Sequence, residues 1–322
     1  MTDNTATTAS TESVYQPQRL SQSLMLPVRN MQYHLRVWQP QQVNPALPLL
    51  VMTHGWMDVA ASYQFVVDAF SQAFMQGRTI VAPDWRGFGA SRTPVPCDSY
   101  YYPDYLADLD VLLDHFSPSQ PVDLVGHSMG GNVVSWYAGI RPERIRRLVN
   151  LEGFGMPPTQ ASQAPARLTQ WLDELRGQRE GALDMKTYAS QSDVANRLQK
   201  TNHRLSRDKA LWLAGEWAAQ NTQGRWVILG DASHKIVNPQ LYRVEEALAC
   251  MSATTAPVLA VETDDNHMER WWQGRYTPEQ YHERLKSIPN CRIARVENAG
   301  HMLHHDQPQA VAQLIESFCQ SE

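Results

Sequence analysis

The segment Gly126-His127-Ser128-Met129-Gly130 has the spacing of a serine nucleophile. It lies between an apolar run at 122–128, typical of a buried strand, and a stretch at 129–140 with helical periodicity. A serine between a strand and a helix stands on a tight, strained turn, where side chains two residues away on either side would clash. Glycines at positions 126 and 130 meet that requirement. The turn lifts the Ser128 hydroxyl clear of the sheet, which predicts a nucleophile.

A serine hydroxyl attacks poorly unless a general base lies within hydrogen-bond distance. The chain has eleven histidines, and His301 closes the last predicted strand segment at 291–301. Open parallel sheets bind ligands at the carboxyl ends of their strands, the edge at which Ser128 is also expected. We therefore predict that His301 is the general base. His304 and His305 begin the final helical stretch, where a surface position is expected.

The imidazole of a general base needs a carboxylate that fixes its tautomer and stabilises the imidazolium. Two acidic residues follow predicted strands at the same edge of the sheet. Glu152 is at the end of the strand at 147–153, and Asp265 comes after the strand at 256–262. The residues alone leave both candidates open.

The tetrahedral intermediate of acyl transfer needs two backbone N–H donors. Met129, directly after the nucleophile, and Trp56, in the turn that ends the predicted strand at 48–55, have suitable positions. We also expect Trp56 and His127 to contact the substrate.

The surrounding segments alternate between short apolar runs and longer amphipathic stretches. Two antiparallel strands are predicted to meet near Asn30, and the helical stretches are 62–74, 101–116, 129–140, 277–288 and 307–318. Strands are predicted at 48–55, 79–87, 122–128, 147–153, 256–262 and 291–301, of which the first two are apolar enough to be buried. Strands that alternate with helices require crossover connections, so we predict an α/β fold with a mostly parallel sheet and helices on both faces.

This alternation breaks after Gly155. Residues 156–248 contain helical stretches and no convincing buried strand, which predicts a helical cap between two parts of one core, 19–155 and 249–322. Residues 1–18 are polar and rich in Thr and Ser, without an export signal, and are predicted to be a flexible tail. Tryptophans in and after the cap would either line a substrate cleft or pack the cap on the sheet: Trp171, Trp212, Trp217, Trp226, Trp271 and Trp272.

Composition excludes several classes of protein. The 322 residues include 28 Lys+Arg and 33 Asp+Glu, a net charge of −5 that argues against nucleic acid as a partner. No apolar stretch approaches the roughly 20 residues of a membrane helix. The scattered cysteines favour a reducing compartment, so we expect a cytoplasmic protein. There is no phosphate-binding loop and no His/Cys cluster with ligand spacing, so we expect neither a nucleotide nor a metal cofactor.

Four motifs in chain order resemble those of the α/β-hydrolase superfamily. They are His54-Gly55-Trp56, similar to its oxyanion turn, the loop at 84–91, similar to its Asp-x-Arg-Gly-x-Gly-x-Ser motif, the nucleophile elbow at 126–131, and Gly300-His301. The resemblance covers about residues 20–155 and 250–320. It implies an eight-stranded sheet with an inserted cap and a triad in the order serine, acid, histidine.

The sequence departs from the superfamily pattern at the acid. Most members place an aspartate nine residues past the proline that opens the strand after the cap, and counting from Pro257 that position is Asn266. One branch of the haloalkane dehalogenases instead has a glutamate after the strand before the cap. Glu152 follows Ser128 by a similar interval of 24 residues. The resemblance therefore favours Glu152, with Asp265 as the alternative acid.

A serine at the elbow favours an acyl-enzyme route over epoxide hydrolysis and dehalogenation, for which superfamily members use an aspartate. We expect hydrolysis of a small to medium carboxylester without a cofactor; monomer and homodimer both stay open. One alternative is a C–C bond hydrolase of a diketone-like acid, in which His234 or Lys235 could hold the substrate carboxylate. The other is a non-catalytic ligand-binding protein of this fold.

Overall fold

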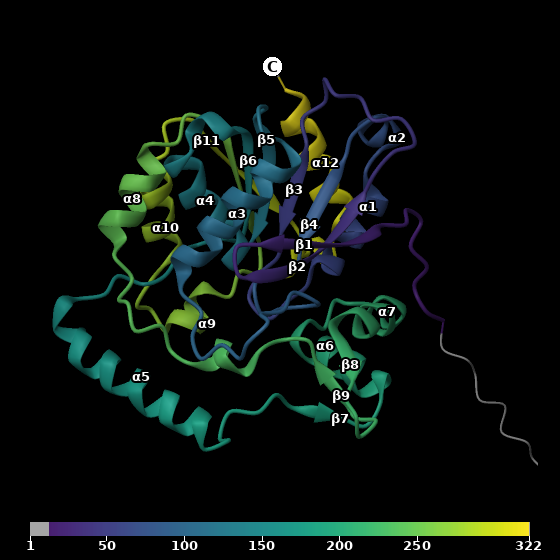
Figure 1. Cartoon of the computed structure of the whole chain (residues 1–322). Helices are drawn as coiled ribbons and strands as arrows, with labels where there is room; N and C mark the ends of the chain where they lie inside the picture. The colour runs from purple at the N-terminus through teal and green to yellow at the C-terminus, as the bar shows by residue number, and fades with distance from the viewer. Residues whose placement is uncertain (1–12, 322) are drawn as a thin grey trace, which may run out of the picture.

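The computed structural model describes residues 13–321 and contains an eight-stranded central sheet (Figure 1). The strand order is β1-β2-β4-β3-β5-β6-β10-β11. β2 pairs antiparallel with both β1 and β4, and the other pairs are parallel. The strands are Gln22–Val28 (β1), Met31–Trp38 (β2), Leu50–Thr53 (β3), Ile80–Pro83 (β4), Val122–His127 (β5), Ile145–Leu151 (β6), Val258–Thr263 (β10) and Cys291–Val296 (β11). The predicted mostly parallel α/β sheet is confirmed.

Helices cover both faces of this sheet. Figure 1 shows α3, α4, α8 and α10 on one side and α1, α2 and α12 on the other. Leu109 and Val133 pack in the core on the first side, and Val67 and Ile315 pack in the core on the second. The helices are Gln64–Ala69 (α1), Gln72–Met75 (α2), Tyr102–Phe116 (α3), Met129–Ile140 (α4), Val244–Ser252 (α8), Met268–Trp272 (α9), Pro278–Leu285 (α10), Leu303–Asp306 (α11) and Pro308–Gln320 (α12).

The central strands are apolar because both of their faces are covered. Every residue of β3, β4, β5 and β10 is buried, as expected for parallel strands between two helical layers. β1 lies at one edge of the sheet, and its exposed residues alternate with less exposed ones along part of its length. The sheet therefore provides a rigid platform, with the carboxyl ends of its parallel strands at one edge.

The single helix predicted at 62–74 is three short pieces in the structure. A 3-10 turn at Ala60–Tyr63 leads into α1, and α2 follows after a break at Phe70. Phe70 has an extended backbone, and the Ser71 hydroxyl accepts the N–H of Phe74 at 3.1 Å as the cap of α2. A serine at such an N-cap position is a start signal that interrupts an otherwise continuous helical pattern.

The inserted segment contains a small sheet that sequence analysis missed. It has helices Ala164–Arg179 (α5), Gln191–Thr201 (α6) and Arg207–Trp217 (α7), and its three strands have the order β7-β9-β8. The strands are Thr187–Tyr188 (β7), Ala218–Gln220 (β8) and Trp226–Ile228 (β9). These strands were not predicted, because strands of two or three residues are too short to show an alternating pattern. Most of their residues are not buried, so they do not conflict with the expectation of no convincing buried strand.

The predicted cap boundary at residue 248 falls inside α8. This helix packs on α4 so closely that a Cβ on Gly139 would lie 1.6 Å from the Cys250 carbonyl oxygen. Because of this packing, α8 belongs with the helices that cover the main sheet.

Three other 3-10 turns connect elements of the fold. Pro142–Arg144 precedes β6, Ala161–Gln163 precedes α5, and Ala232–Lys235 follows β9.

Part of the predicted flexible tail is docked on the protein. Residues 1–12 lie outside the described residues, but Tyr15 packs edge-on against Phe65 and Trp212. Its hydroxyl donates to Asp68 at 2.5 Å, and the N–H of Gln18 donates to the same carboxylate at 3.0 Å. The expectation of a flexible tail therefore does not fit residues 15–18.

Two further observations concern membrane association and the state of the cysteines. Within residues 13–321, none of the helices has both the length and the hydrophobicity needed to cross a bilayer. All four cysteines are free thiols: Cys97, Cys250, Cys291 and Cys319.

Candidate active site

Ser128 stands on the tight turn between β5 and α4. Its φ of 52° and ψ of −114° are strained for a residue with a side chain. The side chain is partly exposed, while every residue of β5 before it is buried. The strand and the helix therefore hold the hydroxyl in a fixed position at the carboxyl edge of the sheet.

The glycines on either side of Ser128 are required by close backbone packing. A Cβ on Gly126 would lie 2.5 Å from the carbonyl oxygen of Gly130. A Cβ on Gly130 would lie 2.4 Å from the carbonyl oxygen of Thr53, at the end of β3. Both distances are below any that real Cβ atoms adopt, so the steric interpretation of the Gly-x-Ser-x-Gly spacing agrees with the structure.

His301 brings the serine and a carboxylate into one hydrogen-bonded chain. Its Nε2 lies 2.9 Å from Ser128 Oγ, and its Nδ1 lies 3.2 Å from Glu152 Oε2. Since a carboxylate only accepts, Nδ1 carries the ring proton and Nε2 is free to accept from the serine hydroxyl. This is the tautomer that a general base needs.

Glu152 is held rigidly beneath His301. It follows β6 directly with a φ of 56°, and its side chain is fully buried. Its second oxygen, Oε1, accepts the backbone N–H of Thr263 at 2.8 Å and the Thr263 hydroxyl at 3.1 Å. Thr263 is the last residue of β10 and belongs to no sequence motif, so sequence analysis did not identify its role in holding Glu152.

The Asp265 carboxylate makes neither a hydrogen bond nor an ion pair with His301 and has other partners. It pairs with Arg204 at 2.9 Å and faces His267 at 3.7 Å, with its side chain 45% exposed. The neighbouring Asp264 accepts the backbone N–H groups of Asn298 and Ala299. Of the two candidate acids, the structure brings only Glu152 to the imidazole.

The turn at 54–56 lies against the nucleophile. A Cβ on Gly55 would be 3.1 Å from the Ser128 Cβ, so Trp56 follows at the position expected of an oxyanion donor. Met129 is the first residue of α4, and the N–H groups of a first helical turn have no partner inside the helix. The buried ring of His54 fixes the turn, because its Nε2 accepts the N–H of Trp85 at 2.8 Å.

The two residues expected to contact the substrate occupy different environments. Trp56 is 54% exposed and borders the nucleophile turn. His127 is 1% exposed, and its Nε2 donates to the carbonyl oxygen of His301 at 2.7 Å. Because its ring is enclosed, the position of His127 does not fit the expectation of substrate contact.

The tryptophans divide into a packing group and a group near the site. Trp212, Trp217 and Trp226 pack in the core of the inserted segment, where Trp217 Nε1 donates to the Met57 carbonyl at 2.8 Å. Trp271 instead meets the His301 ring edge-on at 4.4 Å and is 40% exposed. An apolar surface therefore adjoins the imidazole.

His234 and Lys235 are not arranged to hold a substrate carboxylate. The His234 ring is stacked between Phe88 and Tyr100, each at 3.8 Å, and burial lowers its pKa to about 4. Lys235 donates to the carbonyl oxygen of Asp184 at 2.7 Å. A neutral, enclosed imidazole cannot pair with a carboxylate at neutral pH.

The surface position expected for His304 and His305 was wrong, since the two are 0% and 3% exposed. α11 turns them inward, and the ring of His304 packs 4.3 Å from that of His127. The short α11 is separate from α12, so these residues do not begin a surface helix. Sequence gives no local signal for this burial, because the residues that enclose them come from distant segments.

Comparisons with known proteins agree with this architecture. A sequence profile of the alpha/beta hydrolase fold matches residues 48–308. A serine hydrolase-like protein of Danio rerio is 25% identical over 308 residues, which span 94% of this chain and 90% of the relative.

Solved structures show the same similarity. The thioesterase domain from the curacin biosynthetic pathway has a TM-score of 0.76 at 25% identity, over 92% of this chain and 99% of that domain. An esterase of Mycobacterium tuberculosis has a TM-score of 0.66 at 16% identity, over 94% of this chain and 92% of the esterase. Because the profile covers most of the sequence, this chain belongs to the α/β-hydrolase fold family and is a hydrolase of that fold.

Proposed function

We propose that this protein is a serine hydrolase that cleaves a small to medium carboxylester through an acyl-enzyme. Ser128 is the nucleophile, His301 the general base and Glu152 the triad acid. The observation that carries this proposal is the chain of contacts from Ser128 Oγ to His301 Nε2 at 2.9 Å and from His301 Nδ1 to Glu152 at 3.2 Å. The similarity to a serine hydrolase-like protein and to a thioesterase domain supports chemistry at a carbonyl carbon.

Acylation begins when Ser128 Oγ forms a bond to the ester carbonyl carbon. His301 Nε2 takes the hydroxyl proton, and the carbonyl π electrons move to the oxygen, which becomes an oxyanion. The intermediate collapses when the C–O bond to the alcohol breaks. The leaving alkoxide oxygen takes the proton from His301, and an acyl-Ser128 ester remains.

Deacylation repeats these steps with water. The water oxygen bonds to the acyl carbon while His301 Nε2 takes a proton from the water. The second tetrahedral intermediate then expels Ser128 Oγ, which takes that proton back from His301. The products are a carboxylic acid and an alcohol. Glu152 stabilises the imidazolium in both halves, since its buried carboxylate faces Nδ1.

The N–H groups of Met129 and Trp56 stabilise the oxyanion. Met129 begins α4, and Trp56 follows Gly55, whose Cβ would lie 3.1 Å from the Ser128 Cβ; these positions beside the nucleophile support the assignment. The positive end of the α4 dipole adds to the effect of Met129. Backbone donors held by β3, β5 and α4 do not reorganise as charge develops, so they favour the intermediate over the substrate.

The surroundings of Ser128 suit an ester with an apolar group. Trp56, 54% exposed, borders the nucleophile turn, and Trp271, 40% exposed, meets the imidazole edge-on. In this proposal, residues 156–248 act as a cap over that edge of the sheet. Every step uses only residues of this chain, the substrate and water.

The test is hydrolysis of short- and medium-chain p-nitrophenyl esters together with labelling by a fluorophosphonate probe. The Ser128→Ala variant should lose both turnover and labelling. Ser252→Ala, which removes an exposed hydroxyl on α8, is the matched control and should retain both. Turnover or labelling that persists in folded Ser128→Ala would refute the assignment of the nucleophile.

A folded wild type that neither turns over esters nor reacts with the probe would refute the enzymatic proposal. Such a result, together with a ligand recovered intact from the protein, would favour the non-catalytic alternative. Labelling without ester turnover would direct the search to other carbonyl substrates, including thioesters and C–C substrates.

A further inference from the structure

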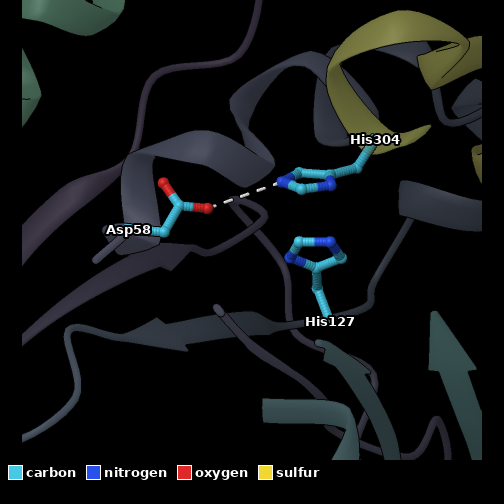
Figure 2. Close-up of side chains that lie close together, drawn as sticks. All are labelled: Asp58, His127 and His304. Carbon is cyan, nitrogen blue, oxygen red and sulfur yellow. Dashed lines mark ion pairs between the residues drawn. The ribbon is translucent and has the colours of Figure 1, made fainter. Parts of the chain in front are cut away.

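A buried group of three side chains lies behind the triad, and no step of the proposed reaction uses it. Asp58 follows the oxyanion turn, His127 ends β5 next to Ser128, and His304 lies in α11 (Figure 2). Their residues are 6%, 1% and 0% exposed. Three segments that are distant in the sequence thus converge on one enclosed point.

Each of the three side chains ends in an atom that lacks a hydrogen-bond partner within residues 13–321. These atoms are Oδ2 of Asp58, Nδ1 of His127 and both ring nitrogens of His304. Buried polar groups in folded proteins are nearly always paired, so a cluster of unpaired ones indicates a bound ion or water.

The unpaired atoms are close enough to share one ion. One ligand atom from each residue lies within 4.8 Å of the other two. Asp58 Oδ2 and His304 Nε2 face each other at 3.6 Å, the ion pair marked in Figure 2, which is too long for a hydrogen bond. With bonds of about 2.1 Å, a tetrahedral Zn²⁺ holds its ligand atoms about 3.4 Å apart. Side-chain movements of roughly 1 Å would therefore complete the site.

The other ends of two of these groups are already fixed. His127 Nε2 donates its proton to the His301 carbonyl at 2.7 Å, which leaves Nδ1 as the lone-pair atom. Asp58 Oδ1 accepts the Ser62 hydroxyl, which leaves Oδ2 available. Histidine ligands of metals typically donate their second ring proton to a carbonyl or carboxylate in this way.

The ligand types suit a cation as well. Metal ions bind imidazole nitrogens and carboxylate oxygens, and the cluster offers two of the former and one of the latter.

We propose that Asp58, His127 and His304 form a binding site for one divalent transition metal ion. Two imidazole nitrogens and one carboxylate oxygen fit Zn²⁺, whereas Ca²⁺ and Mg²⁺ prefer ligand sets made of oxygen alone. The ion joins the oxyanion turn, the end of β5 and α11, and so stabilises the fold behind His301. Sequence spacing did not reveal the site, because its ligands are 69 and 177 residues apart along the chain.

The test measures metal binding to the full chain without an affinity tag and does not depend on ester turnover. Chelator-treated wild type is titrated with Zn²⁺ against a chromophoric competitor, and bound zinc is counted after desalting. We expect about one ion per chain. His304→Gln and Asp58→Asn should each weaken binding by more than about 100-fold, beyond what loss of an outer contact causes.

Two control variants separate this site from other histidines. His115→Gln removes an exposed ring on α3, and His301→Gln removes the neighbouring imidazole of the triad. Both should bind Zn²⁺ as the wild type does. A wild type that binds no ion, or zinc binding that His304→Gln leaves unchanged, would overturn the proposal.

A second measurement covers ligand variants that do not fold. Zn²⁺ should raise the Tm of the wild type and EDTA should reverse the rise, because an ion that binds only the folded chain stabilises it. Co²⁺ should give the visible absorption of a nitrogen- and oxygen-liganded ion. If neither effect occurs, the proposal fails, and Asp58 and His304 form only a buried ion pair.

Discussion

Replacing Glu152 by glutamine should remove most of the activity by reversing the tautomer of His301. Oε1 of Glu152 accepts two hydrogen bonds from Thr263, so the amide oxygen of a glutamine would take that position. Its NH₂ group would then face His301 Nδ1, which must become an acceptor. The ring proton moves to Nε2, which faces Ser128 at 2.9 Å and can no longer take the hydroxyl proton.

The expected loss is large, because the wrong tautomer blocks both halves of the reaction. The same change in a serine protease triad lowers kcat about 10⁴-fold. The contact between Nδ1 and Glu152 is 3.2 Å here, longer than a strong charge-assisted hydrogen bond. We therefore expect a loss of about 10³–10⁴-fold in kcat, which corresponds to about 4–5.5 kcal/mol. The Tm should change little, since glutamine has the same shape and keeps the contacts to Thr263.

The assay compares kcat and kcat/KM of Glu152→Gln, Asp265→Asn and wild type on one p-nitrophenyl ester, with the Tm of each. Asp265 is half-exposed and pairs with Arg204, so Asp265→Asn should change kcat by less than about threefold. The reasoning is refuted if folded Glu152→Gln keeps more than about a tenth of the activity. It is also refuted if Asp265→Asn loses as much as Glu152→Gln.

Three further predictions concern stability and the support of the acid. Burial lowers the pKa of His234 from 6.5 to about 4, so between these pH values the unfolded chain binds a proton that the folded chain does not, and stability falls as the pH drops. His234→Phe should lessen the fall in unfolding free energy between pH 7 and pH 4.5 by about 2 kcal/mol in urea titrations, and equal falls in both proteins would contradict this. Gly130→Ala should destabilise the fold by about 2–4 kcal/mol, because its Cβ would lie 2.4 Å from the Thr53 carbonyl oxygen. Gly177 lies in α5, and a Cβ there would meet nothing closer than the Ala182 Cβ at 3.7 Å, so Gly177→Ala should be neutral or add up to about 1 kcal/mol. Equal effects of the two substitutions in thermal melts would count against the packing argument. Thr263→Val removes one hydroxyl donor to Glu152 and keeps the backbone donor, so kcat should fall up to about tenfold with KM unchanged; an unaltered kcat would mean that the hydroxyl does not help to position the acid.

The serine and histidine positions could be predicted from sequence because each is defined by local chain geometry. Ser128 needs a strand, two glycines and a helix within a few residues, and all of these leave a sequence pattern. His301 follows the last parallel strand, so its edge of the sheet is set by the direction of that strand. Neither inference requires knowledge of a distant contact.

The buried histidines could not be predicted, because their surroundings are assembled from distant segments. His304 follows a loop and precedes polar residues, which locally resembles a surface helix start. In the structure α11 packs it against His127, Tyr63 and Asp58. The strands of the inserted segment were not predicted for a related reason: they are very short, and β9 pairs with both β7 and β8, which come from other parts of the segment.

The order of the strands in the sheet explains why the sequence alone could not distinguish Glu152 from Asp265 as the acid. β6 and β10 are neighbours in register, with Leu151 beside Val261, so acidic residues after either strand reach the same edge of the sheet. Chain spacing cannot distinguish two such positions, whereas side-chain partners can. With Glu152 beneath the imidazole, the loop after β10 makes other contacts: Asp264 accepts N–H groups at 298 and 299, and Asp265 pairs with Arg204 of the inserted segment.

The same inserted segment reaches the loop of His301 by a second route. Asn202 donates to Asp306 at 2.7 Å, and the other oxygen of Asp306 accepts the N–H of Gly300 at 2.9 Å. The Asp306 carboxylate thus links Gly300, the residue before His301, to the loop between α6 and α7. Since Glu152 follows β6 and faces His301, Asp265 after β10 and Asp306 in α11 are available to bind the inserted segment. The carboxylate that faces His301 is therefore a different one from the carboxylates that bind the inserted segment.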